Sequence, residues 1–287
     1  MTTSLSLILS GVLLVVCAFT LIKYFDLPDL YSNQLVKPNI FIYWDKGWKN
    51  APYICKQCLR SWKKHNDKDF NIVELDDNNL SKWIRDETVL TTIKKIQTHK
   101  STTQASDLLR LNLLANNGGL WVDATILCTQ PLRSYIHTIK NKYGYWFPFD
   151  IDSKLQTNNF IYCEKNNKLF QKVTNAINLH FKDMSIEDVS DKSFLYIVSL
   201  TYDEFNKQID WNVIRNKQFE TASNKNKQGS KQLANSANLL LQPYSPQLFN
   251  KLNSQKYLKL TTRHGVSEFT SFPKNSIIYH LFQYHST

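Results

Sequence analysis

Glycine and cysteine are scarce in this sequence. The 287 residues include only 7 glycines and 8 prolines, which excludes a collagen-like chain and a Pro/Gly-rich disordered one. The 5 cysteines are odd in number and unevenly spaced, so they form no disulfide framework and favour a reducing compartment. No P-loop, GxGxxG, HExxH or Ser-His-Asp order is present. The sequence therefore lacks the common signatures of ATPases, dinucleotide-dependent enzymes, zinc proteases and serine hydrolases.

Positive charge, by contrast, is plentiful. Lys and Arg number 35 against 24 Asp and Glu, a net charge of +11. A basic surface favours an anionic partner such as nucleotide phosphates, an anionic bilayer or nucleic acid. No dense Lys/Arg block is present, so the alternative is a generally basic composition, and we expect no nucleic-acid partner. Hydrophobic residues make up 42% of the chain, enough for a sizeable core.

The longest uncharged run lies near the N-terminus. Leu5 to Ile22 holds 18 residues without a charge and would span about 27 Å as a helix, close to a bilayer's hydrocarbon core. The lack of a basic segment before it and of a small-residue cleavage site favours a single membrane anchor over a cleaved signal peptide or a buried helix. Because Lys23 and further lysines follow, the positive-inside rule places the main domain in the cytoplasm. We predict an anchor over 1–23, a stalk over 24–37 and one domain over 38–287.

The main domain begins with alternating strand and helix patterns. Asn39–Trp44 and Phe70–Leu75 are short runs rich in β-branched and aromatic residues, typical of buried strands. Between them, Ile54, Cys58 and Trp62 recur at helical spacing. Strand, helix and strand in this order predict a βαβ unit of an α/β domain that binds a nucleotide at its strand ends.

Later segments are less regular. We expect helical pieces over 80–98, strands at 146–149 and 159–162, helices at 169–181 and 192–205, an exposed loop at 217–235, and apolar runs at 257–261 and 276–282 that return to the sheet edge or cover the site. Cys55 and Cys58 are expected to be two helix residues one turn apart, with a zinc or redox pair as the alternative.

The most informative stretch runs from Ser101 to Thr125 and reads STTQASDLLRLNLLANNGGLWVDAT. Its first half predicts a largely buried helix, because hydroxyl residues stand at its N-cap and leucines cover most of its circumference. Asp107 and Arg110 are three residues apart on that helix, so they share a face and can pair. Either the pair only orients the fold, or Asp107 faces a ribose or sugar hydroxyl while Arg110 fixes its direction.

The second half of this stretch predicts a turn, a strand and one carboxylate. Gly118 and Gly119 end the helix, Leu120–Val122 form a short buried strand, and Asp123 follows it. An unpaired buried charge costs several kcal/mol, so Asp123 needs a cation or hydrogen-bond donors. A divalent ion that bridges Asp123 to a diphosphate would meet that need and would stabilise a leaving nucleoside diphosphate.

The pattern SDLLRLNLLANNGGLWVDAT, residues 106–125, resembles the signature of glycosyltransferases with a DxD motif, most closely those of capsular polysaccharide synthesis. Weaker similarity extends over residues 38–261 and includes PNIFIYWDKGWKNAP, CLRSWKKHNDKDFNIVELD, TNNF and KLT. The resemblance implies a GT-A fold, an α/β domain with a mixed central sheet flanked by helices. It also implies sugar transfer from a nucleotide donor, usually with retention and with Mn²⁺ or Mg²⁺.

These patterns yield a set of predicted site residues. We predict that Asp123 and Asp107 are catalytic. We predict that the substrate or nucleotide is bound by Trp44, Trp48, Ser106, Asp107, Arg110, Gly118, Gly119 and Asn159. A base or sugar would stack on Trp44 or Trp48, whereas Trp121, between two apolar residues, is expected in the core. The family's motif has a second acid two residues after Asp123, where this chain has Thr125. We predict a metal at Asp123 and Thr125 completed by His280, for which a structural role is the alternative.

Together these features predict a membrane-anchored glycosyltransferase. It would transfer a sugar with retention from a nucleotide sugar, expected to be a UDP-sugar, to a glycan or lipid-linked acceptor of a cell-surface polysaccharide. One alternative is a lumenal type II glycosyltransferase of a eukaryotic secretory compartment. The other is a membrane-tethered sugar-binding protein with a degenerate site, which Thr125 in place of an acid favours.

Overall fold

The computed structural model describes residues 37–99, 101–140, 142–147, 149–150, 155–156, 158–182, 241–260, 262 and 266–287. The residues from Pro38 to Thr287 belong to one compact unit. The predicted anchor, the stalk up to residue 36, the helix at 192–205 and the loop at 217–235 lie outside the described residues. Among the helices within the described ranges, none combines the length and the apolar character that crossing a bilayer requires.

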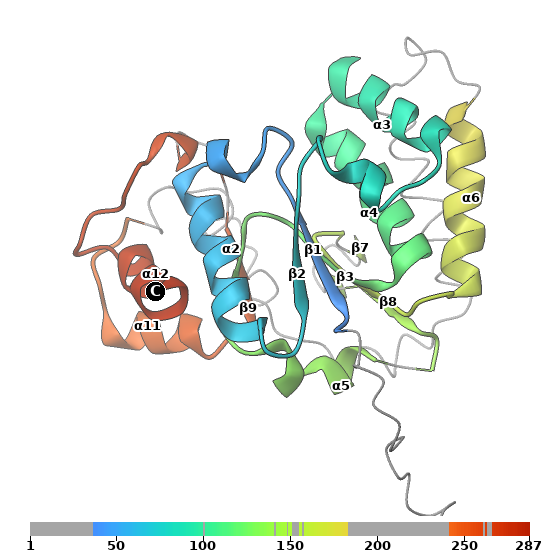
Figure 1. The fold of residues 1–287 in the computed structure, drawn as a ribbon. Helices are drawn as coiled ribbons and strands as arrows, with labels where there is room; N and C mark the ends of the chain where they lie inside the picture. Colours follow the sequence, from blue (N-terminus) through green and yellow to red (C-terminus); the bar gives the residue numbers. More distant parts are fainter. Residues whose placement is uncertain are drawn as a thin grey trace, which may run out of the picture. The chain divides into compact units, whose positions relative to one another are not determined.

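Five strands form a mixed central sheet in the order β2-β1-β3-β8-β5 (Figure 1). β1 (Asn39–Tyr43) is parallel to both β2 (Asn71–Leu75) and β3 (Gly119–Val122). β8 (Phe160–Cys163) is antiparallel to both β3 and β5 (Tyr145–Trp146). The predicted mixed sheet is confirmed, and its parallel half follows from the helical crossover between β1 and β2.

Helices cover both faces of this sheet. The other elements are η1 (Trp48–Asn50), α2 (Tyr53–Asn66), η2 (Leu80–Lys82), α3 (Glu87–His99), α4 (Thr102–Asn117), β4 (Ile126–Cys128), η3 (Leu132–Ser134), α5 (Ile136–Ile139), β6 (Phe149–Asp150), β7 (Leu155–Gln156), α6 (Lys168–Lys182), α11 (Pro246–Asn253), β9 (Tyr257–Lys259), η4 (Val266–Glu268) and α12 (Ile277–Ser286). Figure 1 shows α2, α11 and α12 on one side of the sheet and α3, α4 and α6 on the other.

Alternate residues of the central strands enter two separate cores. In β1, Ile40 and Ile42 belong to the core under α2 and α12, whereas Phe41 and Tyr43 belong to the core under α3, α4 and α6. This period of two is that of a strand buried on both faces. Trp121 of β3 joins the second core, as the sequence predicts. Trp121 therefore lies on the α4 side of the sheet, where a helix can hold polar groups against it.

The final apolar run differs from its prediction. Residues 276–282 were expected to return to the sheet edge or cover the site, but they form α12, capped by the Ser276 hydroxyl, which accepts a hydrogen bond from the amide of Tyr279. The buried Ile277, Ile278, Leu281 and Phe282 recur at helical spacing, and this stripe packs on α2. The run at 257–261 does return as a strand, β9, which pairs antiparallel with β4 in a two-stranded ribbon.

Candidate functional site

A cavity of about 530 Å³ opens at the carboxyl ends of β1 and β3. Open α/β sheets bind their ligands at this end, because the loops there are free to carry side chains toward a ligand. Four segments line the cavity: the loop after β1, the first turns of α4, the residues after β3, and β9 with the residues that follow it. The cavity therefore joins parts of the chain that are far apart in sequence.

The N-terminus of α4 forms one wall. The Ser101 hydroxyl caps the helix by accepting a hydrogen bond from the amide of Gln104 at 3.2 Å. Thr102 and Thr103 of the first turn line the cavity, and the Thr102 hydroxyl also donates to Oδ2 of Asp45 at 3.0 Å. Free amides and the helix dipole together make such a helix start favourable for an anion.

Asp123 lies at the centre of the charged groups. Its amide donates to the carbonyl of Asn159 at 2.9 Å, which secures the residue just beyond β3. Its Oδ1 accepts from Nε1 of Trp121 at 3.0 Å, and its Oδ2 lies 2.7 Å from Nζ of Lys259. Burial alone would raise the pKa of Asp123, but the charges of Lys259 and Arg110 and the two side-chain hydrogen bonds lower it below its ordinary value. Asp123 is therefore held as a carboxylate.

Lys259 supplies the closest cation. Its Nζ lies 2.7 Å from Oδ2 of Asp123 and 2.7 Å from Oγ1 of Thr125. The ladder between β9 and β4 fixes this position, because Lys259 is opposite Ile126 and the amide of Leu260 donates to the carbonyl of Thr125 at 2.8 Å. Lys259 was not among the predicted site residues. Two signals were present, a lone lysine within the apolar run YLKL and the segment KLT of the family resemblance, which begins at Lys259.

Arg110 is the second cation and is only 4% exposed. Its Nε donates to the carbonyl of Ser106 at 3.0 Å, Nη2 donates to Oγ of Ser106 at 2.8 Å, and Nη1 donates to the carbonyl of Asn158. The guanidinium lies 5.1 Å from the ring centre of Trp121, and its Nη1 is 3.7 Å from Oδ1 of Asp123. With the contact of 2.9 Å between Nη2 and Oδ1 of Asp107, four of its five donors are used inside the protein, so Arg110 mainly positions Asp123.

Asp107 forms an ion pair with Arg110 and is not among the residues that line the cavity. Its Oδ1 lies 2.9 Å from Nη2 of Arg110 and accepts from Nδ2 of Asn158 at 2.8 Å. Burial and the charge of Asp123 raise the pKa of Asp107, although Arg110 and the hydrogen bond from Asn158 lower it. Asp107 does not line the cavity, so the structure favours an ion pair that orients the fold over a catalytic aspartate. A contact between Asp107 and the ligand stays a prediction.

Of the other predicted site residues, the structure brings Trp44, Ser106, Arg110, Asp123 and Thr125 together around the cavity. Trp121 also lines it, in addition to its place in the core. The indole Nε1 of Trp44 is buried and has no hydrogen-bond partner among the described residues. An unpaired buried donor beside a cavity is a group that a ligand oxygen can satisfy.

The two glycines lie at the opposite end of β3 from Asp123. Asp123 comes four positions after Gly119, about 13 Å along a strand. A Cβ on Gly118 would come within 2.5 Å of the amide nitrogen of Lys165, and one on Gly119 within 2.5 Å of the carbonyl oxygen of Asn39. Both also have positive φ, at 65° and 104°. These glycines permit close backbone packing, and nucleotide binding by them stays a prediction.

Trp48, Asn159 and His280 are not among the residues that line the cavity. Trp48 lies in η1 and packs against the core under α2. Asn159 acts through its backbone, as the acceptor for the amide of Asp123. His280 lies on α12, across the sheet from α4, with its ring centre 4.1 Å from that of Tyr244 (Figure 1). His280 does not line the cavity, and its part in a metal-ligand set stays a prediction.

The donors around Asp123 do not fit a divalent ion. Among the described residues, no group of three or more His, Cys, Asp or Glu side chains is placed to hold one. Both oxygens of Asp123 already accept hydrogen bonds, and Thr125 accepts from the same ammonium. A divalent ion at Asp123 would also lie beside the positive charges of Lys259 and Arg110, which would repel it.

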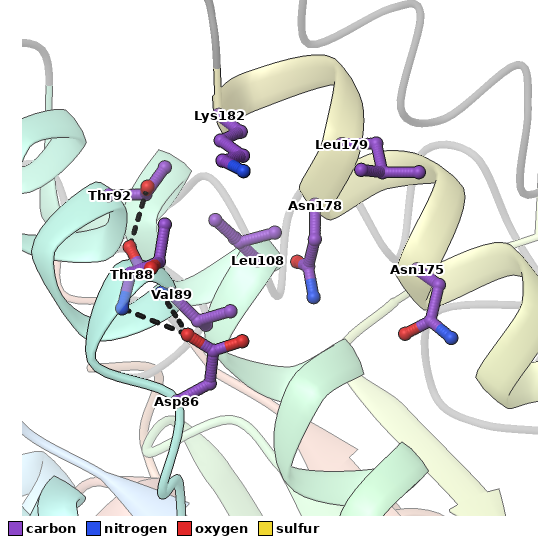
Figure 2. A pocket seen from close by; sticks show the side chains of 9 residues that line it. All are labelled: Asp86, Thr88, Val89, Thr92, Leu108, Asn175, Asn178, Leu179 and Lys182. Atoms are coloured by element: carbon purple, nitrogen blue, oxygen red, sulfur yellow. Dashed lines mark hydrogen bonds between the residues drawn. The ribbon is translucent and has the colours of Figure 1, made fainter.

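A second cavity, of about 370 Å³, lies between α3, α4 and α6 (Figure 2). Asp86 lines it, and its Oδ1 accepts from the amides of Thr88 at 2.9 Å and Val89 at 3.3 Å, as a cap of α3 does. Asn178 of α6 also lines it and exchanges two side-chain hydrogen bonds with Asn112 of α4, at 3.0 and 2.8 Å. These polar groups hold helices in place, so this cavity is not the candidate site.

Comparison with known families gives one match over most of the chain. A family model described as "Capsular polysaccharide synthesis protein" matches residues 20–281. Among curated proteins, the subversion of eukaryotic traffic protein A of Legionella pneumophila subsp. pneumophila (strain Philadelphia 1) is 35% identical over 74 residues, which is 25% of this chain. The matched part spans 11% of the length of that protein.

Several solved structures are similar over part of the chain. The PaToxG glycosyltransferase has a TM-score of 0.42 and 15% identity, covering 63% of this chain and 72% of that one. The UDP-bound glycosyltransferase domain from the YGT toxin has a TM-score of 0.39 and 12% identity, over 61% and 68%. The glycosyltransferase GlyE of Streptococcus pneumoniae TIGR4 has a TM-score of 0.37 and 11% identity, over 60% and 44%.

Proposed function

Since this chain belongs to the family of capsular polysaccharide synthesis proteins, we propose that it is a glycosyltransferase that binds a nucleotide sugar in the cavity at the ends of β1 and β3. The family, predicted from residues 106–125, is confirmed. One observation carries the proposal: Asp123, Lys259 and Arg110 form a charged cluster at the strand ends, beside the N-terminus of α4. Such a combination suits a diphosphate next to a polar sugar.

The cavity offers a separate place for each part of the donor. Three of its charged lining residues are cations, Lys46, Arg110 and Lys259, against the two carboxylates of Asp45 and Asp123. Lys46, Lys259 and the start of α4 would bind the diphosphate, since they concentrate positive potential there. The rings of Tyr43, the last residue of β1, and of Trp44, which follows it, would hold the base or ribose by stacking. We expect the nucleotide to be UDP.

Transfer with retention agrees with the state of the two carboxylates. Asp123 is paired with Lys259, and Asp45 accepts from Thr102, so both carboxylates have partners within the protein, and a same-face transfer requires neither as nucleophile or base. In a same-face transfer, the bond from the sugar C1 to the donor phosphate oxygen breaks, and that oxygen keeps the electron pair. The acceptor hydroxyl bonds to C1 and passes its proton to the departing phosphate. The protein then orients both reactants and stabilises the charge on the diphosphate.

The acceptor and the cell compartment are part of the same proposal. A glycan or lipid-linked precursor of a cell-surface polysaccharide fits the family. The apolar run at Leu5–Ile22 would anchor the chain in a membrane in a single pass, with Lys23 and the main domain in the cytoplasm. There the enzyme would meet both the nucleotide-sugar pool and a lipid-linked acceptor in the inner leaflet, and its net charge of +11 would favour the anionic surface.

A donor screen tests the activity. The purified full chain is incubated with a panel of UDP- and GDP-sugars, and release of the nucleoside diphosphate and the fate of the sugar are followed by mass spectrometry. We expect turnover of at least one UDP-sugar and its loss in Asp123→Ala. If no sugar nucleotide is bound or turned over, the enzyme proposal is abandoned. Binding without turnover would instead support the tethered sugar-binding protein.

The compartment has its own test. Protease treatment of sealed inverted membrane vesicles, in which the cytoplasmic side faces outward, should degrade the main domain. Protection of that domain from the protease would support the opposite, lumenal orientation.

A further inference from the structure

The charge around Asp123 is already balanced inside the protein. Asp107 and Asp123 contribute two negative charges, and Arg110 and Lys259 contribute two positive ones, through contacts of 2.9, 3.7 and 2.7 Å. Each oxygen of Asp123 has a hydrogen-bond donor. The position that a bridging metal would take beside Asp123 and Thr125 is the position of the Lys259 ammonium, 2.7 Å from both side chains.

Lys259 also has capacity for a ligand. An ammonium carries three donors, and Asp123 and Thr125 use two of them. The side chain of Lys259 is 24% exposed and lines the cavity, whereas Arg110 is 4% exposed with four of its five donors used internally. Lys259 is therefore the more exposed of these two cations, and its third donor has no partner among the described residues.

We propose that Lys259 replaces the divalent ion of this site: its ammonium holds Asp123 and Thr125 and binds the donor diphosphate, so that donor binding and diphosphate release need no metal. This inference rests on the proposed function and adds to it a phosphate-binding residue. Asp123 then acts by holding the ammonium in place, rather than as a metal ligand. Thr125 takes the position of the second acid because a neutral hydroxyl suffices to orient an ammonium that already has one carboxylate partner.

The test measures binding of UDP and GDP to the full chain in detergent, by calorimetry, with EDTA and with Mn²⁺. We expect one of the two nucleotides to bind with nearly the same affinity in EDTA as in Mn²⁺. In EDTA, Lys259→Met should weaken binding about 10- to 100-fold, since a charge-assisted contact is lost. Lys259→Arg should retain most of the affinity because it keeps the charge. Lys251→Met removes a lysine from an exposed position on α11 and serves as the matched control.

A second readout separates this role from a merely structural one. In Lys259→Met, Asp123 and Thr125 lose their cation, so added Mn²⁺ should now improve UDP binding, although it does not in the wild type. If Lys259→Met does not fold, as followed by circular dichroism, the double variant Asp123→Asn/Lys259→Met takes its place. That variant removes both charges of the pair and leaves no unpaired carboxylate. It should bind UDP as weakly as the single variant, and Mn²⁺ should not rescue it.

The possible results distinguish the two proposals. Wild-type binding that requires Mn²⁺ would overturn the role of Lys259 and leave the glycosyltransferase standing. Wild-type affinity of Lys259→Met in EDTA would also overturn the role of Lys259 and leave the glycosyltransferase proposal standing. If only the double variant folds, wild-type affinity of the double variant would overturn that role in the same way. Absence of UDP and GDP binding under both conditions would overturn the proposed function together with this inference.

Discussion

The two cavities of this molecule use polar side chains in opposite ways. In the second cavity, Asp86 caps the helix that directly follows it, and Asn178 pairs with Asn112 across two packed helices. In the first, Asp123 pairs with Lys259, which is 136 positions further along the chain, and lies 3.7 Å from Arg110. In the second cavity, Asp86 and Asn178 hydrogen-bond to groups that hold the helices together. In the first, Asp123 and Lys259 form a partly exposed ion pair that lines the cavity.

This difference shows that the way the polar groups of a cavity are held helps to identify a site. Ionised groups that are partly removed from water cost free energy, and they persist where partners from several elements hold them. The first cavity gathers such partners from α4, β3 and β9. The second is lined by two charged residues, Asp86 and Lys182, and the Asp86 carboxylate caps α3 while Asn178 pairs with Asn112. Substitutions of the same kind in the two cavities should therefore have different effects.

The largest effect is expected for Asp123→Asn, compared with Asp86→Asn. Loss of the carboxylate releases Lys259 and leaves Arg110 beside a neutral group, so turnover should fall about 100-fold, or about 2.7 kcal/mol. Asparagine caps helices as well as aspartate does, so Asp86→Asn should leave turnover unchanged. Both are measured as kcat/KM with the best donor from the screen. Equal losses in the two variants would remove the distinction between the cavities.

Next in size is Arg110→Lys. The lysine keeps the charge but cannot form the fork that holds Ser106, Asp107 and the carbonyl of Asn158. We expect a loss of about 2 kcal/mol in the free energy of unfolding, measured with urea, and about tenfold weaker UDP binding. Arg133→Lys, at a side chain that is 70% exposed, is the control and should change neither. Unchanged stability in Arg110→Lys would show that the buried fork is dispensable.

A smaller effect should appear in the pH dependence of stability. The folded-state pKa of Asp123 is lowered, so its contribution is present above the ordinary value of 3.8 and is lost as pH falls through the folded value. In Lys259→Met, burial dominates and raises this pKa, so the sign reverses. The stability of that variant relative to wild type should fall by about 1–2 kcal/mol between pH 4 and pH 7. The double variant Asp123→Asn/Lys259→Met should not show this fall in stability, because it has no carboxylate at position 123. Unfolding curves of the three proteins at several pH values test the prediction, and an equal pH dependence in Lys259→Met and wild type would contradict it.

The smallest effect is expected in the second cavity. Asn178→Ala leaves the side chain of Asn112, which is 2% exposed, with its hydrogen bond to the carbonyl of Leu108 but without its partner on α6. Stability should fall by about 1 kcal/mol. The affinity for UDP should stay at the wild-type value, because no group of the first cavity moves. A loss of UDP affinity in Asn178→Ala would link the two cavities and contradict the comparison.

Local patterns predicted much of the fold correctly. The helix from Ser101, the strands at Asn39–Trp44 and Phe70–Leu75 and the helix at 169–181 correspond to α4, β1, β2 and α6. These elements carry strong periodicity and caps, which are local properties. The run at 276–282 was mistaken because a short apolar run fits either period until its packing partner is known. α2 is that partner.

The sequence by itself determined the family, the α/β class, and Asp123 at the end of a buried strand with a need for a cation. Only the tertiary structure decided which cation meets that need. Lys259 reaches Asp123 because β9 pairs with β4, and no local pattern specifies a ladder between strands 130 residues apart. The same holds for Gly118 and Gly119, whose backbone contacts come from Lys165 and Asn39. Spacing along the chain reports local conformation, whereas charge pairing depends on which distant segments fold against each other.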